Sequence, residues 1–400
     1  MTTPTYDVVV VGGGPAGATA AHDLVRRGRS VLLLDRAGRV KPCGGAVPPK
    51  LLQEFEVDES ILVARVRAAR IVSPTQRQVD MPIDGGYVGM VDREVFDEWL
   101  RVRAADAGCE RAAGSFIRLD RDRDGVSRLH YKTGSGDKAV TSSVRARAVI
   151  GADGAASEVA KQCLPDCEPT YVYAYHEIIR SPQPAAANAD GAFDAHRCDI
   201  YYQSPLSPDF YGWVFPHGDT TSVGTGTASR GFSIRRAVGL LRERAGLTGA
   251  ETLRREGAPI PMKPLARWDN GRDVVLAGDA AGVVAPASGE GIYYAMTGGR
   301  LAADAVEAFL ATGKASALAQ ARVRFMKAHG KVFWILGIMQ RFWYSSDNRR
   351  ERFVTMCGDK DVQRLTWEAY LHKRLVRAAP MAHLRIFAKD MAHLLGLVRA

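Results

Sequence analysis

Short apolar runs separated by a glycine turn occupy the first 35 residues of the chain. Residues 6–11 form an apolar, β-branched run that leads directly into the glycine-rich stretch 12–17. Apolar residues then recur at helical spacing over 16–27, and residues 30–34 form a second apolar run that ends at Asp35. We therefore predict a strand, a glycine turn, a helix and a second buried strand, in that order.

Similar patterns recur along the rest of the chain. They predict an amphipathic helix over 92–107, a meander of strands within 111–150, a strand-rich and aromatic region over 165–265, a buried strand at 273–277 and a helix over 292–310. From residue 321 onward the pattern is helical, basic and aromatic.

These patterns predict three parts of the chain. The first is a discontinuous nucleotide-binding domain of residues 1–164 and 266–325, the second is an inserted, mostly antiparallel substrate domain of residues 165–265 joined by strands near 65–90, and the third is a basic helical segment of residues 326–400.

Composition narrows the class of protein. With 46% apolar residues, a chain of 400 residues can bury a large core, and no apolar run approaches the length of a membrane span. No basic residues precede the first apolar run, so we expect no cleaved signal peptide. The six cysteines are scattered, which suits a reducing cytoplasm, and Cys163 and Cys167 lack a matching histidine pair, so we expect no metal site.

The net charge of +10 is concentrated in the last part of the chain. Residues 321–400 contain 16 Lys and Arg against 6 Asp and Glu, and Lys331 and Arg341 bracket the apolar and aromatic run 332–339. Such a helix suits either an anionic membrane surface or packing on the domain core. Nucleic acid is not an expected partner, because nothing else in the chain resembles a nucleic-acid-binding fold.

The glycine turn carries the first candidate chemistry. Gly12, Gly14 and Gly17 follow the G-x-G-x-x-G spacing, in which the glycines permit a tight turn, close approach of a pyrophosphate and close packing of helix on strand. Ala16 lies in the first helical turn, where phosphate is favoured, and Asp35 can accept hydrogen bonds from a ribose diol. The order strand, glycines, helix, strand and acid predicts an adenine dinucleotide rather than a merely structural turn.

A second candidate cofactor element lies far downstream. It consists of Asp279 at the end of the run 273–277 and of Gly289, Gly291 and Ile292 at the start of the next predicted helix. A carboxylate at a strand end can accept hydrogen bonds from ribityl hydroxyls, and a helix N-terminus can face the pyrimidine side of a flavin. Proteins that bind only NAD have no need of this element, so we predict FAD.

Two further stretches are candidate contacts of the cofactor. The loop after Asp35 contains Cys43, Gly44 and Gly45, which can bring backbone N–H groups close to a dinucleotide, although an ordinary connection has the same composition. Arg93 lies in the first turn of a predicted helix, where a cation opposes the helix dipole, so we expect it to reach a phosphate, a carboxylate or a cofactor edge.

Aromatic residues alternate in the strand-rich region. Tyr211, Trp213 and Phe215 are separated by single residues and followed by Pro216, so a strand would place all three rings on one face. Core packing is the ordinary reason for such a stripe. Because this region is inserted between the two predicted halves of the nucleotide domain, its inward face is also a candidate substrate surface.

Together these motifs resemble those of a known family. Residues 12–17, 35, 93, 153–154 and 278–291 resemble the FAD-binding pattern of aromatic-hydroxylase-like flavoproteins. Within that superfamily, Lys41–Gly45, Tyr211–Pro216 and Gly278–Gly282 are similar to the geranylgeranyl reductase family, whose Y-x-W-x-F-P motif the middle stretch matches. The sequence around these stretches is most similar to the chlorophyll and bacteriochlorophyll branch rather than to the archaeal lipid branch.

The resemblance implies a fold and a site. The fold would be α/β, or α+β overall: a Rossmann-like FAD-binding domain, an inserted antiparallel β-sheet substrate domain and a C-terminal helical segment. The implied cofactor contacts are Gly12, Gly14, Ala16, Gly17, Asp35, Cys43, Gly44, Gly45, Arg93, Asp153, Asp279, Gly289, Gly291 and Ile292. The implied substrate contacts are Tyr211, Trp213, Phe215 and Pro216.

The resemblance also implies an activity. NADPH would reduce FAD, and the flavin would deliver hydride to isolated double bonds, so that three rounds convert a geranylgeranyl group to phytyl. No second dinucleotide motif follows residue 35, so we expect NADPH to visit the flavin without a domain of its own. Cys43 is a candidate proton donor, and a bound water or the flavin is the alternative. We expect a cytoplasmic protein, either free or peripheral on the inner or photosynthetic membrane.

The sequence leaves the acceptor and two rival functions open. The geranylgeranyl chain can be esterified to a tetrapyrrole or be a free diphosphate, for which Arg180, Arg197 or Arg230 would be candidate partners. One rival is an FAD-dependent monooxygenase of an aromatic or polyprenyl substrate. The other is a flavoprotein that binds pigment or quinone without carbon chemistry.

Overall fold

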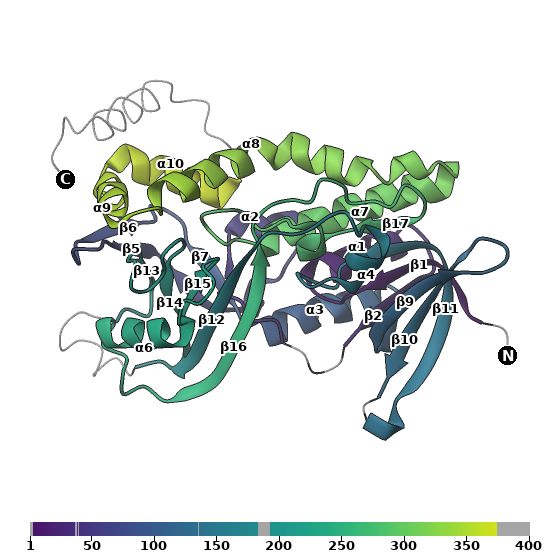
Figure 1. The fold of residues 1–400 in the computed structure, drawn as a ribbon, viewed down its shortest axis with the longest axis horizontal. Helices are drawn as coiled ribbons and strands as arrows, with labels where there is room; N and C mark the ends of the chain where they lie inside the picture. Colours follow the sequence, from purple (N-terminus) through teal and green to yellow (C-terminus); the bar gives the residue numbers. More distant parts are fainter. Residues whose placement is uncertain (1–2, 37, 39, 135, 183–192, 374–400) are drawn as a thin grey trace. The chain divides into compact units, whose positions relative to one another are not determined.

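The computed structural model describes residues 3–36, 38, 40–134, 136–182 and 193–373 of the chain (Figure 1). They divide into two compact units. The first takes its residues from Met1–Lys41, Arg93–Tyr171 and Pro259–Ile335, and the second from Pro42–Asp92, Val172–Ala258 and Leu336–Ala400. Residues 42–92 thus belong to the second unit, whereas the sequence analysis assigned only the strands near 65–90 to it. The mixed α/β architecture predicted from the sequence is confirmed.

A seven-stranded sheet organises the first unit. Its order is β8 (Glu110–Ala113), β2 (Val31–Asp35), β1 (Thr5–Val11), β11 (Val140–Gly151), β10 (Ser127–Thr133) and β9 (Ser115–Arg121), with β17 (Val274–Leu276) also paired to β11. Strands β8, β2, β1, β11 and β17 are parallel, while β9 and β10 continue antiparallel from β11. Strand β1 lies between β2 and β11, so the order of the strands reverses at β1. In open α/β sheets, nucleotides bind at the carboxyl ends of the strands where the order reverses.

Helices pack on this sheet and on one another in the first unit. They are α1 (Pro15–Val25), α3 (Arg93–Asp106), α4 (Glu158–Cys163), α7 (Ile292–Thr312) and the start of α8 (Gln320–Trp343), together with the short 3₁₀ helix η3 (Gly278–Ala281). Helices α1 and α7 pack closely because Gly299 has no side chain: a Cβ there would lie 2.1 Å from the carbonyl oxygen of Ala16. The N-terminal ends of both helices are thereby brought toward η3.

The second unit is built on another seven-stranded sheet. Its order is β16 (Thr252–Pro261), β12 (Tyr171–Arg180), β15 (Thr220–Thr227), β14 (Gly212–His217), β13 (Arg197–Tyr201), β5 (Ala68–Val72) and β6 (Gln78–Pro82). Strands β12, β15, β14 and β13 pair antiparallel in turn, as do β5 and β6. Strand β5, from an earlier segment of the chain, pairs in parallel with β13. A small sheet of β3 (Ala46–Val47), β7 (Val88–Val91) and β4 (Leu62–Val66) accompanies it.

The two faces of the larger sheet differ. Helix α6 (Ile234–Arg244) covers one face, where Val238 and Leu241 pack with Val214, Val223 and other buried residues (Figure 1). The alternate residues of β14 point to the opposite face and are aromatic. Helix α2 (Pro49–Glu54) completes the segment taken from residues 42–92.

The C-terminal helices belong to the second unit from Leu336 onward. They comprise the end of α8, α9 (Asp347–Met356) and α10 (Lys360–His372). The fully buried Arg350 of α9 donates hydrogen bonds to the Ser204 hydroxyl and to the carbonyl oxygens of Pro208 and Tyr344, so it joins α9 to the loop before β14. The predicted helical character is confirmed as far as residue 372, and residues 374–400 lie outside the described part. Within the described residues, no helix has the length and apolar character to cross a membrane.

Candidate functional site

The glycine turn after β1 has one open position and two filled ones. Gly12 has φ +104°, and a Cβ there would lie 2.3 Å from the carbonyl oxygen of Ala152; a Cβ at Gly17 would lie 1.8 Å from the carbonyl oxygen of Gly12. Gly14 is the N-cap of α1, and a Cβ there would meet nothing within 4 Å. Gly12 and Gly17 are therefore glycine because of packing, whereas the space beside Gly14 faces the α1 N-terminus, where phosphate is favoured.

The second cofactor element lies against the first. A Cβ at Gly278 would be 2.7 Å from the Ala16 Cβ, so η3 lies on the first turn of α1. A Cβ at Gly291, the N-cap of α7, would lie 3.9 Å from Asp279 Oδ1. The two helix N-termini and the Asp279 carboxylate, far apart in sequence, thus lie close together. The turn before α7 includes Gly289 at φ +67°, and Ile292 is buried at the start of the helix.

Asp279 has a cationic partner. Lys41 forms an ion pair with the nearly buried Asp279 carboxylate. This contact joins Lys41 to the Gly278–Gly282 motif within the first unit. The carboxylate is held beside the N-terminus of α7, where negative charge is favoured.

Asp35 lies at the end of β2 and is held by a residue that the sequence analysis missed. Arg101, near the end of α3, donates from Nη1 to Asp35 Oδ2 and to the carbonyl oxygen of Gly13, both at 3.2 Å. Glu98 accepts from Arg101 Nε at 2.8 Å. Arg101 therefore connects the carboxylate expected on the ribose to the glycine turn expected on the pyrophosphate. No spacing rule links residues 66 positions apart, so this contact could not be predicted from the sequence.

Arg93 and Asp153 both form structural interactions. Arg93 reaches one of the three expected partners, a carboxylate, because it is buried in a bidentate pair with Asp97 at 2.7 and 2.8 Å. The Asp153 carboxylate caps α4 by accepting from the Ser157 hydroxyl and the backbone N–H of Glu158 and Val159. Burial raises the pKa of Asp153. Their predicted contacts with a cofactor stay predictions. The backbone at Ala152 and Asp153 packs against Gly12.

In the second unit, the Cys43–Gly45 loop lies against the aromatic strand. A Cβ at Gly44 would be 3.1 Å from the Phe215 ring, and a Cβ at Gly45 would be 2.5 Å from His217 Nε2. Gly45 donates its N–H to Cys43 Sγ at 3.4 Å. His217 Nδ1 lies 3.0 Å from the carbonyl oxygen of Phe215, and burial lowers the pKa of His217. The loop implied to contact the cofactor thus touches the strand implied to contact the substrate.

The three predicted rings form a row. Ring centroids are 6.1 Å apart between Tyr211 and Trp213 and 6.3 Å apart between Trp213 and Phe215. Tyr211, Trp213 and Pro216 are buried, and Phe215 packs on an apolar cluster that includes Met90. We refer to this side of the sheet as the aromatic face. The row of rings agrees both with core packing and with a substrate surface, the two interpretations considered from the sequence.

Trp213 lies over a glycine. In the strand register Trp213 faces Gly224 of β15, which in turn faces His176 of β12. A Cβ at Gly224 would be 2.4 Å from Trp213 Cζ2 and 2.5 Å from His176 Cβ. The indole therefore lies flat across β15 only because residue 224 has no side chain.

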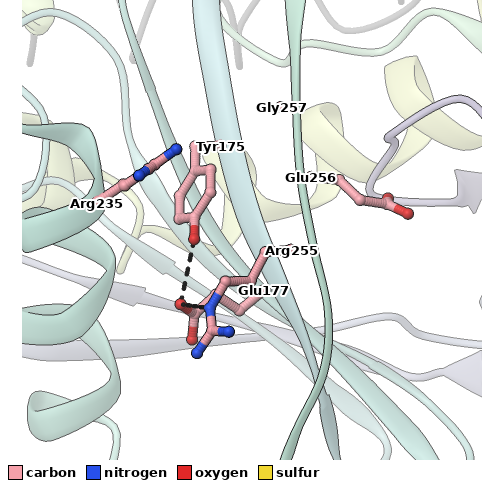
Figure 2. Close-up of a pocket in the computed structure, with 6 residues that line it drawn as sticks. All are labelled: Tyr175, Glu177, Arg235, Arg255, Glu256 and Gly257. Atoms are coloured by element: carbon pink, nitrogen blue, oxygen red, sulfur yellow. Dashed lines mark hydrogen bonds and ion pairs between the residues drawn. The ribbon is translucent and has the colours of Figure 1, made fainter.

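Charged side chains line a cleft on the opposite side of the sheet. The cleft has a volume of about 470 Å³, and its lining residues are Tyr175, Glu177, Arg235, Arg255, Glu256 and Gly257 (Figure 2). Burial acts to raise the pKa of Glu177, but hydrogen bonds from Arg242 and Arg255 hold it below its ordinary value. Two of the three arginines considered for a diphosphate have carboxylate partners, since Arg180 pairs with Glu251 and the buried Arg197 with Asp199; the role of all three, Arg230 included, stays a prediction.

Comparison with known proteins identifies relatives along almost the whole chain. The family model described as "Lycopene cyclase protein" matches residues 7–388. The chain is 54% identical to the geranylgeranyl diphosphate reductase of Rhodobacter capsulatus over 98% of both chains, and 39% identical to that of Synechocystis sp. over 97% of both. Identity falls to 31% over 78% of this chain for the digeranylgeranylglycerophospholipid reductase of Methanoculleus marisnigri. The predicted similarity to the pigment branch rather than the archaeal lipid branch is confirmed.

Solved structures confirm the fold. A geranylgeranyl bacteriochlorophyll reductase-like protein of Thermoplasma acidophilum superimposes with a TM-score of 0.79 at 20% identity, covering 95% of this chain and all of that one. A flavin-dependent brominase superimposes with a TM-score of 0.72 at 17% identity, covering 97% of this chain and 99% of that one. The architecture is that of flavoproteins, as predicted, and the sequence relationship is closer still: the chain belongs to the geranylgeranyl diphosphate reductase family.

Proposed function

We propose that this protein is an FAD-dependent reductase that converts a geranylgeranyl group to phytyl by successive reduction of isolated double bonds. The observation that carries the proposal is the 54% identity, over 98% of both chains, to a protein named geranylgeranyl diphosphate reductase. The arrangement of the motifs supports it: Gly44 lies against Phe215, so the loop and the aromatic strand that characterise the family are in contact.

The residues of the first unit fit FAD. The open space beside Gly14 and the N-terminus of α1 suit the pyrophosphate, and Asp35, oriented by Arg101, suits the adenosine ribose. Asp279 and the N-terminus of α7 suit the ribityl chain and the pyrimidine side of the flavin. When bound and reduced, the cofactor supplies hydride. Reduction of the cofactor by NADPH is part of the proposal, with no separate nicotinamide domain.

The aromatic face of the second unit suits an uncharged polyprenyl chain. Such a chain offers almost no hydrogen bonds, so its site must hold it by apolar contact and exclude water. Tyr211, Trp213 and Phe215 provide that surface, and Pro216 follows them. Cys43, next to Gly44, stays a candidate proton donor from the sequence analysis.

The experiment follows product mass. Purified, FAD-loaded protein is incubated with NADPH under nitrogen, in separate reactions with geranylgeranyl diphosphate and with a geranylgeranyl ester of a chlorophyll-type pigment. We expect the mass of one acceptor to rise by two, four and then six hydrogens, and the reactive acceptor decides between the two substrate classes.

The same reactions test the rival functions. A product that requires oxygen and gains an oxygen atom would indicate a monooxygenase. An unchanged mass would leave cyclisation, which moves hydrogens without adding any, or binding without carbon chemistry. Either result would overturn the proposed reduction.

We also propose peripheral attachment to an anionic membrane through α8. The helix buries Phe333 and Trp343, but Trp334 is 68% exposed and Ile338 is 47% exposed. Lys331 and Arg341 are exposed at positions three residues before Trp334 and three after Ile338. Exposed aromatic and aliphatic side chains flanked by cations are typical of a helix at a membrane surface. Because Phe333 and Trp343 are buried, α8 also packs on the protein core, so the helix would serve both purposes.

A further inference from the structure

Each of the two carboxylates expected to contact FAD is paired with a cation. Asp35 accepts from Arg101 at 3.2 Å, and Asp279 forms an ion pair with Lys41. In the proposed binding mode, Asp35 serves the adenosine end of the cofactor and Asp279 serves the flavin end. All four residues belong to the first unit. The site therefore carries one balanced pair of charges for each end of the cofactor.

The two members of the Lys41–Asp279 pair differ in exposure. The Asp279 side chain is 7% exposed, whereas the Lys41 side chain is 37% exposed. A carboxylate that is withdrawn from water needs a compensating charge, because an unbalanced buried charge is costly. Among the described residues, Lys41 is the ion-pair partner that Asp279 has. Since the lysine is half-exposed, it can be replaced without leaving a cavity in the core.

The N-terminus of α7 adds a partial positive charge beside this pair. A Cβ at Gly291, the N-cap of α7, would lie 3.9 Å from Asp279 Oδ1, and the first turn of the helix contains no acidic residue. A helix N-terminus carries about half a positive charge, which an unbalanced Asp279 would offset. Because Lys41 neutralises Asp279, this partial charge stays available to a negative group of the cofactor.

We infer that Lys41 raises the reduction potential of the bound flavin by neutralising Asp279. The inference rests on the proposed function, in which FAD occupies this site and is reduced by NADPH. Hydride transfer carries two electrons and one proton, so it converts NADPH to NADP⁺ and leaves the flavin with one more negative charge. With Lys41 in place, the added charge meets a neutral ion pair and a helix N-terminus. Without Lys41, it meets an unbalanced carboxylate.

The direction of the effect follows from this charge. A nearby negative charge disfavours the reduced flavin more than the oxidised flavin, because only the reduced form carries the added charge. Loss of Lys41 should therefore lower the potential and make the flavin harder to reduce with NADPH. The later transfer of hydride to a double bond should not slow, since a flavin of lower potential is a stronger reductant. Lys41 is accordingly a positioning residue that acts through Asp279.

The test measures the potential of the bound flavin directly. Wild-type protein, Lys41→Gln and Lys41→Arg are saturated with FAD and equilibrated under nitrogen with a reference dye, without acceptor. In Lys41→Gln we expect the affinity for reduced FAD to fall about tenfold relative to that for oxidised FAD, which lowers the midpoint potential by about 30 mV. Lys41→Arg keeps the charge and should keep the wild-type potential. An unchanged potential in Lys41→Gln would overturn the inference.

Changing Asp279 tests whether the lysine acts through the carboxylate. Asp279→Asn leaves a surplus positive charge at Lys41 and should raise the potential of bound FAD. The double variant, with Lys41→Gln and Asp279→Asn, is neutral again and should return to the wild-type potential. A double variant with a potential as low as that of Lys41→Gln would overturn the neutralisation. If Lys41→Gln failed to fold, an unchanged or lowered potential in Asp279→Asn would also overturn it.

Arg101→Gln is the matched control at the other end of the site. Arg101 also pairs with a cofactor carboxylate, and it donates to the carbonyl oxygen of Gly13 at 3.2 Å. The adenosine end gains no charge when the flavin is reduced. Arg101→Gln should therefore weaken the binding of oxidised and reduced FAD equally and leave the potential unchanged. An equal fall in potential in Arg101→Gln and Lys41→Gln would overturn the inference, because it would then reflect a loosened site.

The half-reactions provide a second readout. At saturating NADPH, Lys41→Gln should reduce its flavin several-fold more slowly than the wild type, while the acceptor should reoxidise the reduced flavin at least as fast. Slower reoxidation with unchanged reduction would overturn the inference. The proposed function is tested separately. Unchanged potentials in a protein that reduces its acceptor overturn the role of Lys41 alone, whereas an acceptor mass that never rises in the wild type overturns the proposed reductase.

Discussion

The glycine turn offers a pair of substitutions that separates cofactor binding from folding. Gly14→Ala places a methyl group where nothing lies within 4 Å, at a backbone φ of −74° that alanine adopts freely. Gly17→Ala places a methyl group 1.8 Å from the carbonyl oxygen of Gly12. An ordinary contact needs about 3.5 Å, so the first turn of α1 and the β1 turn would have to separate by roughly 1.7 Å. Both atoms belong to rigid backbone, so overpacking of this kind costs about 1–3 kcal/mol or more.

The expected results are therefore opposite. Apoprotein of Gly14→Ala should unfold in urea within about 1 kcal/mol of the wild type, since the loss of a favourable N-cap residue to alanine typically costs no more than about 1 kcal/mol. Its affinity for FAD should fall about 100-fold, because the methyl group occupies the path of the pyrophosphate; at saturating FAD the holoprotein then loses about 2.7 kcal/mol of ligand stabilisation. Gly17→Ala should destabilise the apoprotein itself.

Two measurements check this pair: flavin fluorescence titration of apoprotein, and urea unfolding with and without FAD. The reasoning is refuted if Gly14→Ala binds FAD as tightly as the wild type, or if it destabilises the apoprotein as much as Gly17→Ala. In the first case the phosphates lie elsewhere. In the second, the open space beside Gly14 does not exist in solution.

Three further predictions concern stability and membrane binding. Burial acts to raise the pKa of Asp273, but hydrogen bonds from Arg121 and Ser127 lower it. The Arg121–Asp273 ion pair therefore stabilises the fold above about pH 4, and this stabilisation is lost as the pH falls through the pKa of Asp273 in the folded protein. Asp273→Asn should lower the free energy of unfolding in urea by about 2 kcal/mol at pH 7 and by progressively less below about pH 4. Gly45→Ala, with φ +69° and a Cβ 2.5 Å from His217 Nε2, should cost at least 2 kcal/mol, roughly twice the cost of Gly85→Ala, which has φ +68° and open space; equal unfolding midpoints would contradict the close contact. Trp334→Ser with Ile338→Ser should reduce co-sedimentation with anionic vesicles at least tenfold, whereas Val323→Ser, 51% exposed on the same helix, should not; equal binding by all three proteins would exclude α8 as the anchor.

Local pattern predicted those parts of the site that are contiguous in sequence. The turn after β1, the acid at the end of β2 and the alternating rings at the start of β14 and just before it each depend on a few neighbouring residues, and the strands and the turn lie where the pattern indicated. The partner of Arg93 was also within reach, since Asp97 follows at the i+4 spacing of a helix. Asp153 carried a second signal, because Ser157 and Glu158 are typical of a helix start, and the structure uses its carboxylate there.

Contacts made by strand register were beyond the sequence. Ser222 and Glu256 lie 46 and 80 residues from His176, and only the pairing of β12 with its neighbours brings them to one histidine. Arg101 similarly meets Asp35 across α3 and β2. The division of the chain was only partly visible, because β5 pairs in parallel with β13 across more than a hundred residues of intervening sequence. Periodicity identifies elements, but it does not specify which distant elements become neighbours.

The absence of a side chain at Gly224 also sets the depth of the proposed polyprenyl site. The indole of Trp213 lies in the space that any larger residue at 224 would fill, so that residue fixes how far the ring stands above the sheet. Alanine or serine at this position would lift the ring outward and shorten the room above it. A single position on β15 thereby becomes a means of selecting shorter prenyl acceptors without altering any residue that contacts the cofactor.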